Sequence, residues 1–234
     1  MIEYPVSFVG LPIGNREDIT RRALAVLESV DCICCEDTRN TGMLLSHYGI
    51  RKPLLSLHEH NESRRAPEVA SRALAGESFA VVTDAGMPGV SDPGYRLIQE
   101  LKQRGVPFTV LPGPSAVVTA LVGSGLPSDA FFFGGFLAVK SGRRAEVLQK
   151  AVAASYTGIF YESPFRIVKT IQALAEIAPE APVCVARELT KVFETYHRGS
   201  AASLLAEFTA HPPKGEMVVL IGGVNAPREA EENH

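Results

Sequence analysis

The sequence predicts an α/β protein with two α/β domains and mainly parallel sheets. Short apolar segments alternate with segments of helical length along the whole chain, which is typical of repeated strand–helix–strand units. The run at 79–83 is continuously apolar up to its last residue, as expected for a strand covered on both faces. Two prolines and a glycine interrupt the alternation at 111–115, and we expect the domain boundary there.

The first domain is therefore expected over residues 1–112. Its expected strands are 4–9, 31–35, 53–57, 79–83 and 108–111. Its expected helices are 20–29, 38–48, one that ends at Gly76, and 95–104. Asp18 or Thr20 caps the first of these helices, and Gly49 follows the second in a position that favours a left-handed residue.

The second domain is expected over residues 113–224, followed by a polar tail at 225–234 that frays. Its expected strands are 131–133, 158–161, 183–186, 194–197 and 216–221. Its expected helices are 116–123, 143–153, 165–177 and 201–209.

Composition and charge limit the classes of function. The chain has 234 residues, of which 46% are hydrophobic and 21% charged, with a formal net charge of −3. This balance gives no bulk attraction to nucleic acid, although a local basic patch is enough for binding. No apolar run reaches the roughly 18 residues of a membrane helix, and the N-terminus lacks the basic start of a secretory signal. We therefore expect a cytoplasmic protein.

The cysteines and two histidines do not predict a metal site. Cys32, Cys34 and Cys35 lie on one apolar strand, where neighbours point to opposite faces, and Cys184 stands alone. Buried free thiols are the better interpretation. His58 and His60 lack a third ligand at a suitable spacing, so we interpret them as hydrogen-bonding residues near a ligand and expect no metal.

Four loops that follow strands carry the residues most typical of a ligand site. They are 10–15, 84–94, 112–116 and 161–164. The loop 84–94 alone has three glycines, two prolines and two aspartates. Glycine lets backbone groups approach a ligand closely, and proline restricts the loop. None of the four matches a Walker loop or a dinucleotide fingerprint. One such loop is as readily a tight connection, but four at sheet edges favour a cleft.

Separated motifs in order give the chain a specific resemblance, from about residue 4 to residue 222. They include Pro12-Ile13-Gly14-Asn15, Glu36-Asp37-Thr38-Arg39, His58-Glu59-His60-Asn61-Glu62, Asp84-Ala85-Gly86, Ser91-Asp92-Pro93-Gly94-Tyr95, Pro112-Gly113-Pro114-Ser115, Tyr161-Glu162-Ser163-Pro164, Ala186-Arg187-Glu188-Leu189-Thr190-Lys191 and Gly215-Glu216-Met217. With these motifs the chain resembles the tetrapyrrole methylase superfamily. Within it, the chain looks like the branch that methylates the ribose 2′-hydroxyl of a cytidine in bacterial small-subunit ribosomal RNA.

The resemblance implies two α/β domains that bind S-adenosylmethionine in the cleft between them. It also implies a homodimer, since superfamily members are commonly dimers. The cofactor contacts that it implies are Pro12, Asp84, Ala85, Gly86, Val90, Asp92, Ser115, Ala116, Tyr161, Glu162 and Ala186. Asp92 has a second interpretation, because an aspartate ahead of Pro-Gly and a helix can be a helix cap.

Methyl transfer to a ribose hydroxyl needs alignment and a group that receives the hydroxyl proton. Glu188 and Lys191 follow a strand end and are the catalytic candidates, with Lys191 either a base or a cation that stabilises an alkoxide. A surface ion pair explains the same residues equally well. Arg39 is a candidate phosphate clamp, and His58 and His60 are expected at the mouth of the cleft.

Three arginine pairs favour an RNA substrate independently of the resemblance. They are Arg21-Arg22, Arg64-Arg65 and Arg143-Arg144, each near the start of an expected helix. Positive charge there opposes the helix dipole, so either nearby acids or bound phosphates compensate it. The acids at helical spacing are Glu17, Asp18, Glu68 and Glu146. Lys140, Arg143 and Arg144 form the best candidate phosphate patch. The acidic overall charge predicts modest affinity for naked RNA, so for the rRNA substrate that the resemblance implies we expect the assembled 30S particle to be preferred.

Five positions depart from the pattern of the branch. Leu11 and Met87 replace threonines, Gly89 and Val90 replace a bulkier apolar pair, and Phe165 replaces histidine. Two other functions therefore stay open. One is methylation of a corrin or porphyrin precursor with the same cofactor, and the other is RNA binding by a catalytically silent paralogue.

Overall fold

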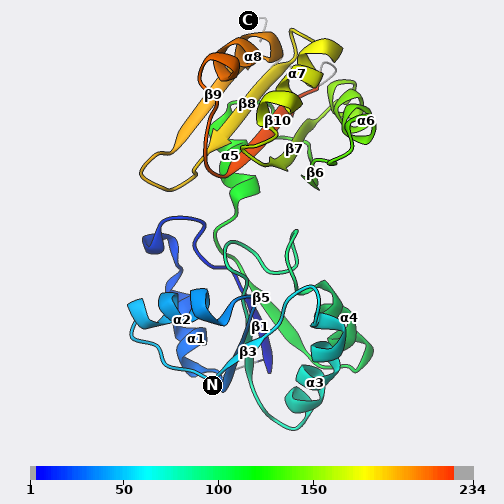
Figure 1. The fold of residues 1–234 in the computed structure, drawn as a ribbon. Helices are drawn as coiled ribbons and strands as arrows, with labels where there is room; N and C mark the ends of the chain where they lie inside the picture. Colours follow the sequence, from blue (N-terminus) through cyan, green and yellow to red (C-terminus); the bar gives the residue numbers. More distant parts are fainter. Residues whose placement is uncertain (1–3, 224–234) are drawn as a thin grey trace, which may run out of the picture. The chain divides into compact units, whose positions relative to one another are not determined.

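The computed structural model describes residues 4–223. The described residues up to Ser115 form one compact unit, and those from Ala116 form a second. Each unit is a sheet with helices packed against it, which confirms the predicted α/β class (Figure 1). None of the described helices is long and apolar enough to cross a membrane. The tail at 225–234 lies outside the described residues.

The first unit contains a five-stranded parallel sheet in the order β3-β2-β4-β1-β5. Its strands are β1 (Val6–Val9), β2 (Cys32–Cys35), β3 (Leu54–Ser56), β4 (Phe79–Val81) and β5 (Phe108–Leu111). Its helices are α1 (Arg21–Ser29), α2 (Thr38–His47), α3 (Glu62–Leu74) and α4 (Tyr95–Gln103), preceded by a short 3-10 helix, η1 (Arg16–Asp18). The sequence predicted each of these elements except η1. Thr20 caps α1, with its hydroxyl accepting the Ala23 N–H at 3.0 Å.

Helices cover both faces of this sheet, so alternate strand residues enter two different cores. Cys32 and Cys34 pack with residues of α3 and α4, while Ile33 and Cys35 pack with residues of α1 and α2. The described cysteines are buried free thiols, as predicted. Burial raises the pKa of Cys35 and of Cys184 to about 11.

The second unit has a five-stranded sheet in the order β6-β7-β10-β8-β9. Its strands are β6 (Phe131–Phe136), β7 (Thr157–Glu162), β8 (Pro182–Arg187), β9 (Thr195–Ser200) and β10 (Met217–Gly222). Its helices are α5 (Ala116–Ser124), α6 (Ser141–Val152), α7 (Ile167–Ile177) and α8 (Ala201–Ala210). Side chains of α6, α7 and α8 share one core with β7, β8 and β10.

This second sheet differs from the expected parallel arrangement. β6 and β7 pair in parallel, but β10 is antiparallel to both β7 and β8, and β8 is antiparallel to β9. The cause is the connection between β8 and β9, which contains no helix and turns the chain back on itself. The last two strands therefore run opposite to the first three. Alternation of strands and helices predicts direction only where a helix separates the strands.

A buried carboxylate joins α3 to the start of α4. Gly94 precedes α4 with a φ of 135° and cannot cap the helix with a side chain. Glu62 does so instead: its Oε1 accepts the N–H of Gly94 at 2.9 Å and that of Leu97 at 3.1 Å. Glu62 is only 4% exposed, so these two N–H groups have no access to water as a substitute.

We predict that Glu62→Ala lowers the free energy of unfolding by about 1–3 kcal/mol, because it leaves two buried N–H donors without an acceptor. Glu62→Gln keeps one acceptor oxygen and should lose less. Thermal and urea denaturation measure the change, with Glu59→Ala as the control because Glu59 is exposed in the same segment. Equal stability of the two alanine variants would contradict the capping role.

Candidate functional site

Three loops meet at the carboxyl edge of the first sheet, after the adjacent strands β4, β1 and β5. The backbones of Leu11 and Gly86 exchange two hydrogen bonds, of 2.9 and 3.0 Å. Gly10 and Gly113 approach so closely that a Cβ on Gly113 would lie 3.0 Å from the Cα of Gly10. Side chains at these two positions would therefore separate the loops. This edge is where open α/β sheets bind ligands.

The loop between β4 and α4 is held in an unusual backbone conformation. Gly86, Gly89 and Gly94 have φ values of 70°, 80° and 135°. Ser91 also has a positive φ, of 62°, which is strained for a residue with a side chain. The N–H of Gly89 donates to the carbonyl of Pro93 at 2.9 Å and closes the loop. Such strain is typical of segments shaped for a ligand.

Carboxylates gather beside this loop. Asp84 accepts the N–H of Asp37 at 3.3 Å and the side-chain amide of Asn40 at 2.8 Å, so it holds the start of α2. Burial, with the charges of Glu36 and Asp84, raises the pKa of Asp92 to about 6. Burial, with the charge of Asp84, also raises the pKa of Glu36. The electrostatic potential at this edge is therefore negative, which favours a positively charged ligand.

The described structure does not show Asp92 as the cap of α4. The cap of α4 comes from Glu62, and the side chain of Asp92 makes no cap hydrogen bond to that helix. Its carboxylate lies instead within the electrostatic reach of Glu36 and Asp84. Asp92 thus stays available to a ligand.

The second unit gathers its own candidates at one sheet edge. β7 and β8 are both antiparallel to β10, and Met217 at the start of β10 pairs with Glu162 and with Arg187. The segments that follow Glu162 and Arg187 therefore leave the sheet on the same side. The predicted residues Tyr161, Glu162, Ala186, Glu188 and Lys191 lie at or just beyond this edge.

Glu162 differs from the other candidates because its side chain is fully buried and fully engaged. It pairs with Arg166 at 2.6 Å, and it accepts the Thr170 hydroxyl at 2.6 Å and the Ser163 N–H at 2.7 Å. The carboxylate of Glu162 is therefore committed to contacts within its own unit. Tyr161 lies between Phe133 and Phe136, with ring centroids 5.0 and 5.3 Å away.

Glu188 and Lys191 form an ion-pair cluster with Glu216. The Lys191 Nζ lies 3.0 Å from Glu188 Oε1 and 2.8 Å from Glu216 Oε2. Hydrogen bonds from the Glu216 backbone and from Lys191 lower the pKa of Glu188. Burial lowers the pKa of Lys191, but hydrogen bonds to Glu216 and Glu188 outweigh it and the net shift is upward. Lys191 is therefore a protonated cation and a poor proton acceptor.

The residues predicted to bind substrate are divided between the two units, with Arg39, His58 and His60 in the first and Lys140, Arg143 and Arg144 in the second. Arg39 is bound to the neighbouring Asp37, with Nη2 2.7 Å from Oδ2, and this contact lowers the pKa of Asp37 to about 2. The rings of His58 and His60 meet edge to face at 6.0 Å. Among the described residues, no group of three His, Cys, Asp or Glu side chains is arranged to hold a metal ion.

The patch predicted around residue 140 needs a correction. Lys140 and Arg143 are exposed, but Arg144 is buried, with only 8% of its surface exposed. Its Nη1 donates to the carbonyl of Val139 at 3.4 Å. Arg144 is therefore not part of an exposed basic surface, because its position on α6 faces the core that contains Leu148.

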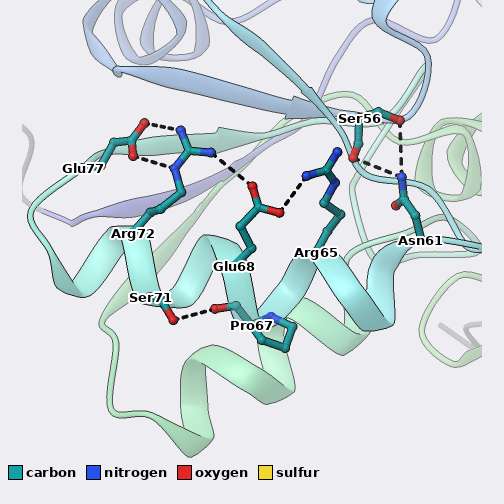
Figure 2. A network of polar contacts seen from close by, with 8 residues as sticks. All are labelled: Ser56, Asn61, Arg65, Pro67, Glu68, Ser71, Arg72 and Glu77. Carbon is teal, nitrogen blue, oxygen red and sulfur yellow. Dashed lines mark hydrogen bonds and ion pairs between the residues drawn. The ribbon is translucent and has the colours of Figure 1, made fainter.

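The acids predicted at helical spacing neutralise an arginine at the start of one helix but not at the start of another. Arg65 Nη1 lies 2.6 Å from Glu68, as predicted, and Figure 2 shows Glu68 between Arg65 and Arg72 on α3. Glu146, in contrast, pairs with Lys150 at 2.8 Å rather than with Arg143 or Arg144.

Two of the positions that depart from the family pattern pack inward and one does not. Leu11 is buried in the core beneath α1 and α2. A Cβ on Gly10 would lie 2.6 Å from the sulfur of Met87, so Met87 fills the space beside that glycine. Phe165 is 92% exposed.

Sequence reasoning did not name Asn40, Glu62 or Glu216 as site residues. Glu62 and Glu216 lie inside motifs that carried the resemblance, so their positions were visible but their partners were not. Each acts on a residue more than twenty positions away in the chain. No local spacing predicts such pairs.

Comparison with known proteins places the chain in a family. A family model described as Tetrapyrrole (Corrin/Porphyrin) Methylases matches residues 5–205. The chain belongs to this family. It is 49% identical over 218 residues to a protein of Vibrio cholerae serotype O1 named "Ribosomal RNA small subunit methyltransferase I", covering 92% of this chain and 76% of that protein. A protein of the same name from Thermotoga maritima is 42% identical, with coverage of 92% and 96%.

Solved structures support the same fold. Diphthine synthase aligns with a TM-score of 0.76 at 15% identity and covers 93% of this chain and 89% of its own. Uroporphyrin-III-C-methyltransferase from Thermus thermophilus aligns with a TM-score of 0.64 at 21% identity, with coverage of 95% and 99%. At these identities the likeness shows the fold alone.

Members of this family take a methyl group from S-adenosylmethionine, and the chain is an S-adenosylmethionine-dependent methyltransferase. The edge of the first sheet fits that cofactor chemically. S-adenosylmethionine carries a positive sulfonium, an ammonium group and a ribose diol, and carboxylates suit all three. Glu36, Asp84 and Asp92 supply negative charge there. The glycine loops supply backbone donors and acceptors without side chains in the way.

We predict that Asp92→Asn stabilises the protein at neutral pH. The folded-state pKa of Asp92 lies above its ordinary value of 3.8, so its ionisation opposes folding and stability falls as pH rises from 3.8 through about 6. The variant should have the higher Tm at neutral pH, and the difference should disappear in more acidic buffer. Asp129→Asn, at an exposed position, is the control. A difference in Tm that stays constant with pH would show that charge is not its cause.

Proposed function

We propose that this chain methylates the ribose 2′-hydroxyl of a cytidine in small-subunit rRNA, on the assembled 30S particle in the cytoplasm, as a homodimer. The observation that carries the proposal is the 49% identity, over 92% of the chain, to a protein named as a small-subunit rRNA methyltransferase. The solved structures named for porphyrin and cobalamin substrates are far less similar, at 21% identity or below. RNA is therefore the better supported substrate class.

The proposed cofactor residues fall into two sets. The first unit contributes Pro12, Asp84, Ala85, Gly86, Val90, Asp92 and Ser115, and the second contributes Ala116, Tyr161, Glu162 and Ala186. Convergence of the three glycine loops and the nearby carboxylates supports the first set. The common edge of β7 and β8 supports the second, with Glu162 acting through its backbone.

In the reaction, S-adenosylmethionine supplies the methyl group as an electrophile. The ribose oxygen forms a bond to the methyl carbon as the carbon–sulfur bond breaks, and the hydroxyl proton leaves. Lys191, held as a cation by Glu188 and Glu216, stabilises negative charge on the attacking oxygen. The oxygen becomes strongly acidic as the new bond forms, so even the weakly basic carboxylate of Glu188 can receive its proton late.

The proposed substrate is tested by mass spectrometry of rRNA nucleosides from cells with and without the gene. We expect one 2′-O-methylcytidine to disappear from the small-subunit rRNA of the deletion strain and to return when purified protein and S-adenosylmethionine are added to its 30S subunits. Naked transcript should be methylated more slowly than 30S subunits. An unchanged nucleoside profile would overturn the RNA function, and equal rates on the two substrates would overturn the preference for the particle.

Substitution of Lys191 tests whether this residue contributes to catalysis or only to stability. We expect Lys191→Met to lower kcat by about 10²–10³-fold, because it removes a charged donor at the reacting oxygen. The affinity for S-adenosylmethionine, measured by calorimetry, should change little, and Lys191→Arg should recover part of the rate. Lys169→Met, at an exposed lysine of α7, is the control. A lower Tm with an unchanged kcat would assign Lys191 to a structural ion pair.

A further inference from the structure

The start of α6 is a helix terminus that the chain leaves without a cap. Lys140 is the N-cap residue and makes no side-chain cap hydrogen bond, and the first turn contains no acidic residue. At α1, by comparison, the Thr20 hydroxyl accepts a first-turn N–H. The first N–H groups of a helix of this length point out of its end and attract an anion.

A buried guanidinium at the same place is the second observation. Arg144 is 8% exposed, and its Nε has no hydrogen-bond partner. Its Nη1 reaches back to the carbonyl of Val139, so the guanidinium lies against the segment that leads into the helix. Helical side chains lean toward the N-terminus, which directs this charge to the same end as the free N–H groups.

No carboxylate of the described residues pairs with this charge. Within residues 4–223, neither Arg143 nor Arg144 forms an ion pair, and the nearest acid in the helix, Glu146, is bound to Lys150 at 2.8 Å. A buried charge without a counter-ion is unfavourable, so an anion from outside the chain would complete the site.

The site is accessible within its own unit. Val139 is 77% exposed, and Lys140, Ser141, Gly142 and Arg143 are all exposed. α6 directly follows β6 at one side of the second sheet (Figure 1). Lys140 and Arg143 add two exposed cations to the helix end.

We propose that the N-terminus of α6, with Arg144 beneath it and Lys140 and Arg143 around it, binds a backbone phosphate of the RNA substrate. This inference rests on the proposed function and assigns to it a specific contact. Phosphate oxygens accept from backbone N–H groups, and such contacts position an RNA without reading its sequence. The site therefore sets where the RNA lies rather than which base is chosen.

Gly142 allows a test that does not disturb the fold. A Cβ built on Gly142 meets nothing within 4 Å. Gly142→Asp places a carboxylate at the helix end, where it favours the helix dipole but repels phosphate. Gly142→Asn has the same shape without the charge. We expect the Asp variant to bind a labelled single-stranded RNA, and 30S subunits, at least tenfold more weakly than the Asn variant. The two variants should have equal affinity for S-adenosylmethionine. The Tm of the Asp variant should equal or exceed that of the Asn variant. Equal RNA affinities would overturn the proposal.

A charge-matched pair separates a local contact from general electrostatics. Arg143→Ala and Lys169→Ala each remove one exposed positive charge from the second unit. We expect only Arg143→Ala to flatten the dependence of log affinity on log salt, by about 0.7 for one lost phosphate contact on a single strand. Equal effects of the two variants would overturn the proposal.

Inorganic phosphate alone tests whether the site takes RNA or any anion. Perturbation of the amide signals of Ser141 to Arg143 by phosphate, together with RNA competition for it, supports the proposal. Phosphate binding that RNA does not displace would assign the site to a free anion and overturn it. These binding measurements need no methyl transfer, so failure of this site and failure of the proposed reaction are distinguishable.

Discussion

The close approach of the Gly10 and Gly113 backbones is the constraint on which the loop arrangement of the first unit depends. Parallel strands release their loops at one edge, but they do not by themselves bring those loops together. Here the absence of two side chains lets the loops after β1 and β5 meet, and the Leu11–Gly86 hydrogen bonds add the loop after β4. The sulfur of Met87 occupies the remaining space beside Gly10. A family member with a threonine in place of Met87 would fill this space differently.

The two sheet edges have opposite electrostatic designs. In the first unit, the charge of Asp84 opposes ionisation of Glu36 and of Asp92, and partial desolvation adds to the cost of charging those two side chains. In the second, Lys191 is held between two carboxylates that keep it charged. The first arrangement is relieved by a cationic ligand such as a sulfonium. The second holds a cation that, in the proposed reaction, would stabilise the attacking oxygen as it becomes negative. Each edge thus suits a different part of a methyl transfer.

The sequence predicted the fold more fully than the site, for physical reasons. Local periodicity and turn residues such as Gly49 and Thr20 marked nearly every helix and strand, because these signals act within a few residues. The antiparallel placement of β10 was missed, since sequence order does not show that a late strand inserts between β7 and β8. The pairing of Arg65 with Glu68 followed from helical spacing. The burial of Arg144 and the cap from Glu62 depend on partners that only tertiary packing brings near.

The hydrogen bonds of Glu62 affect how much conformational entropy the loop before α4 loses when a ligand binds. By binding the N–H groups of Gly94 and Leu97, it fixes the end of a loop that already contains the strained Ser91. These contacts restrain the loop in the absence of a ligand, so a ligand that docks against it should lose less affinity to ordering the chain. A loop fixed in this way is preorganised, and binding there should be limited by access and desolvation rather than by conformational search.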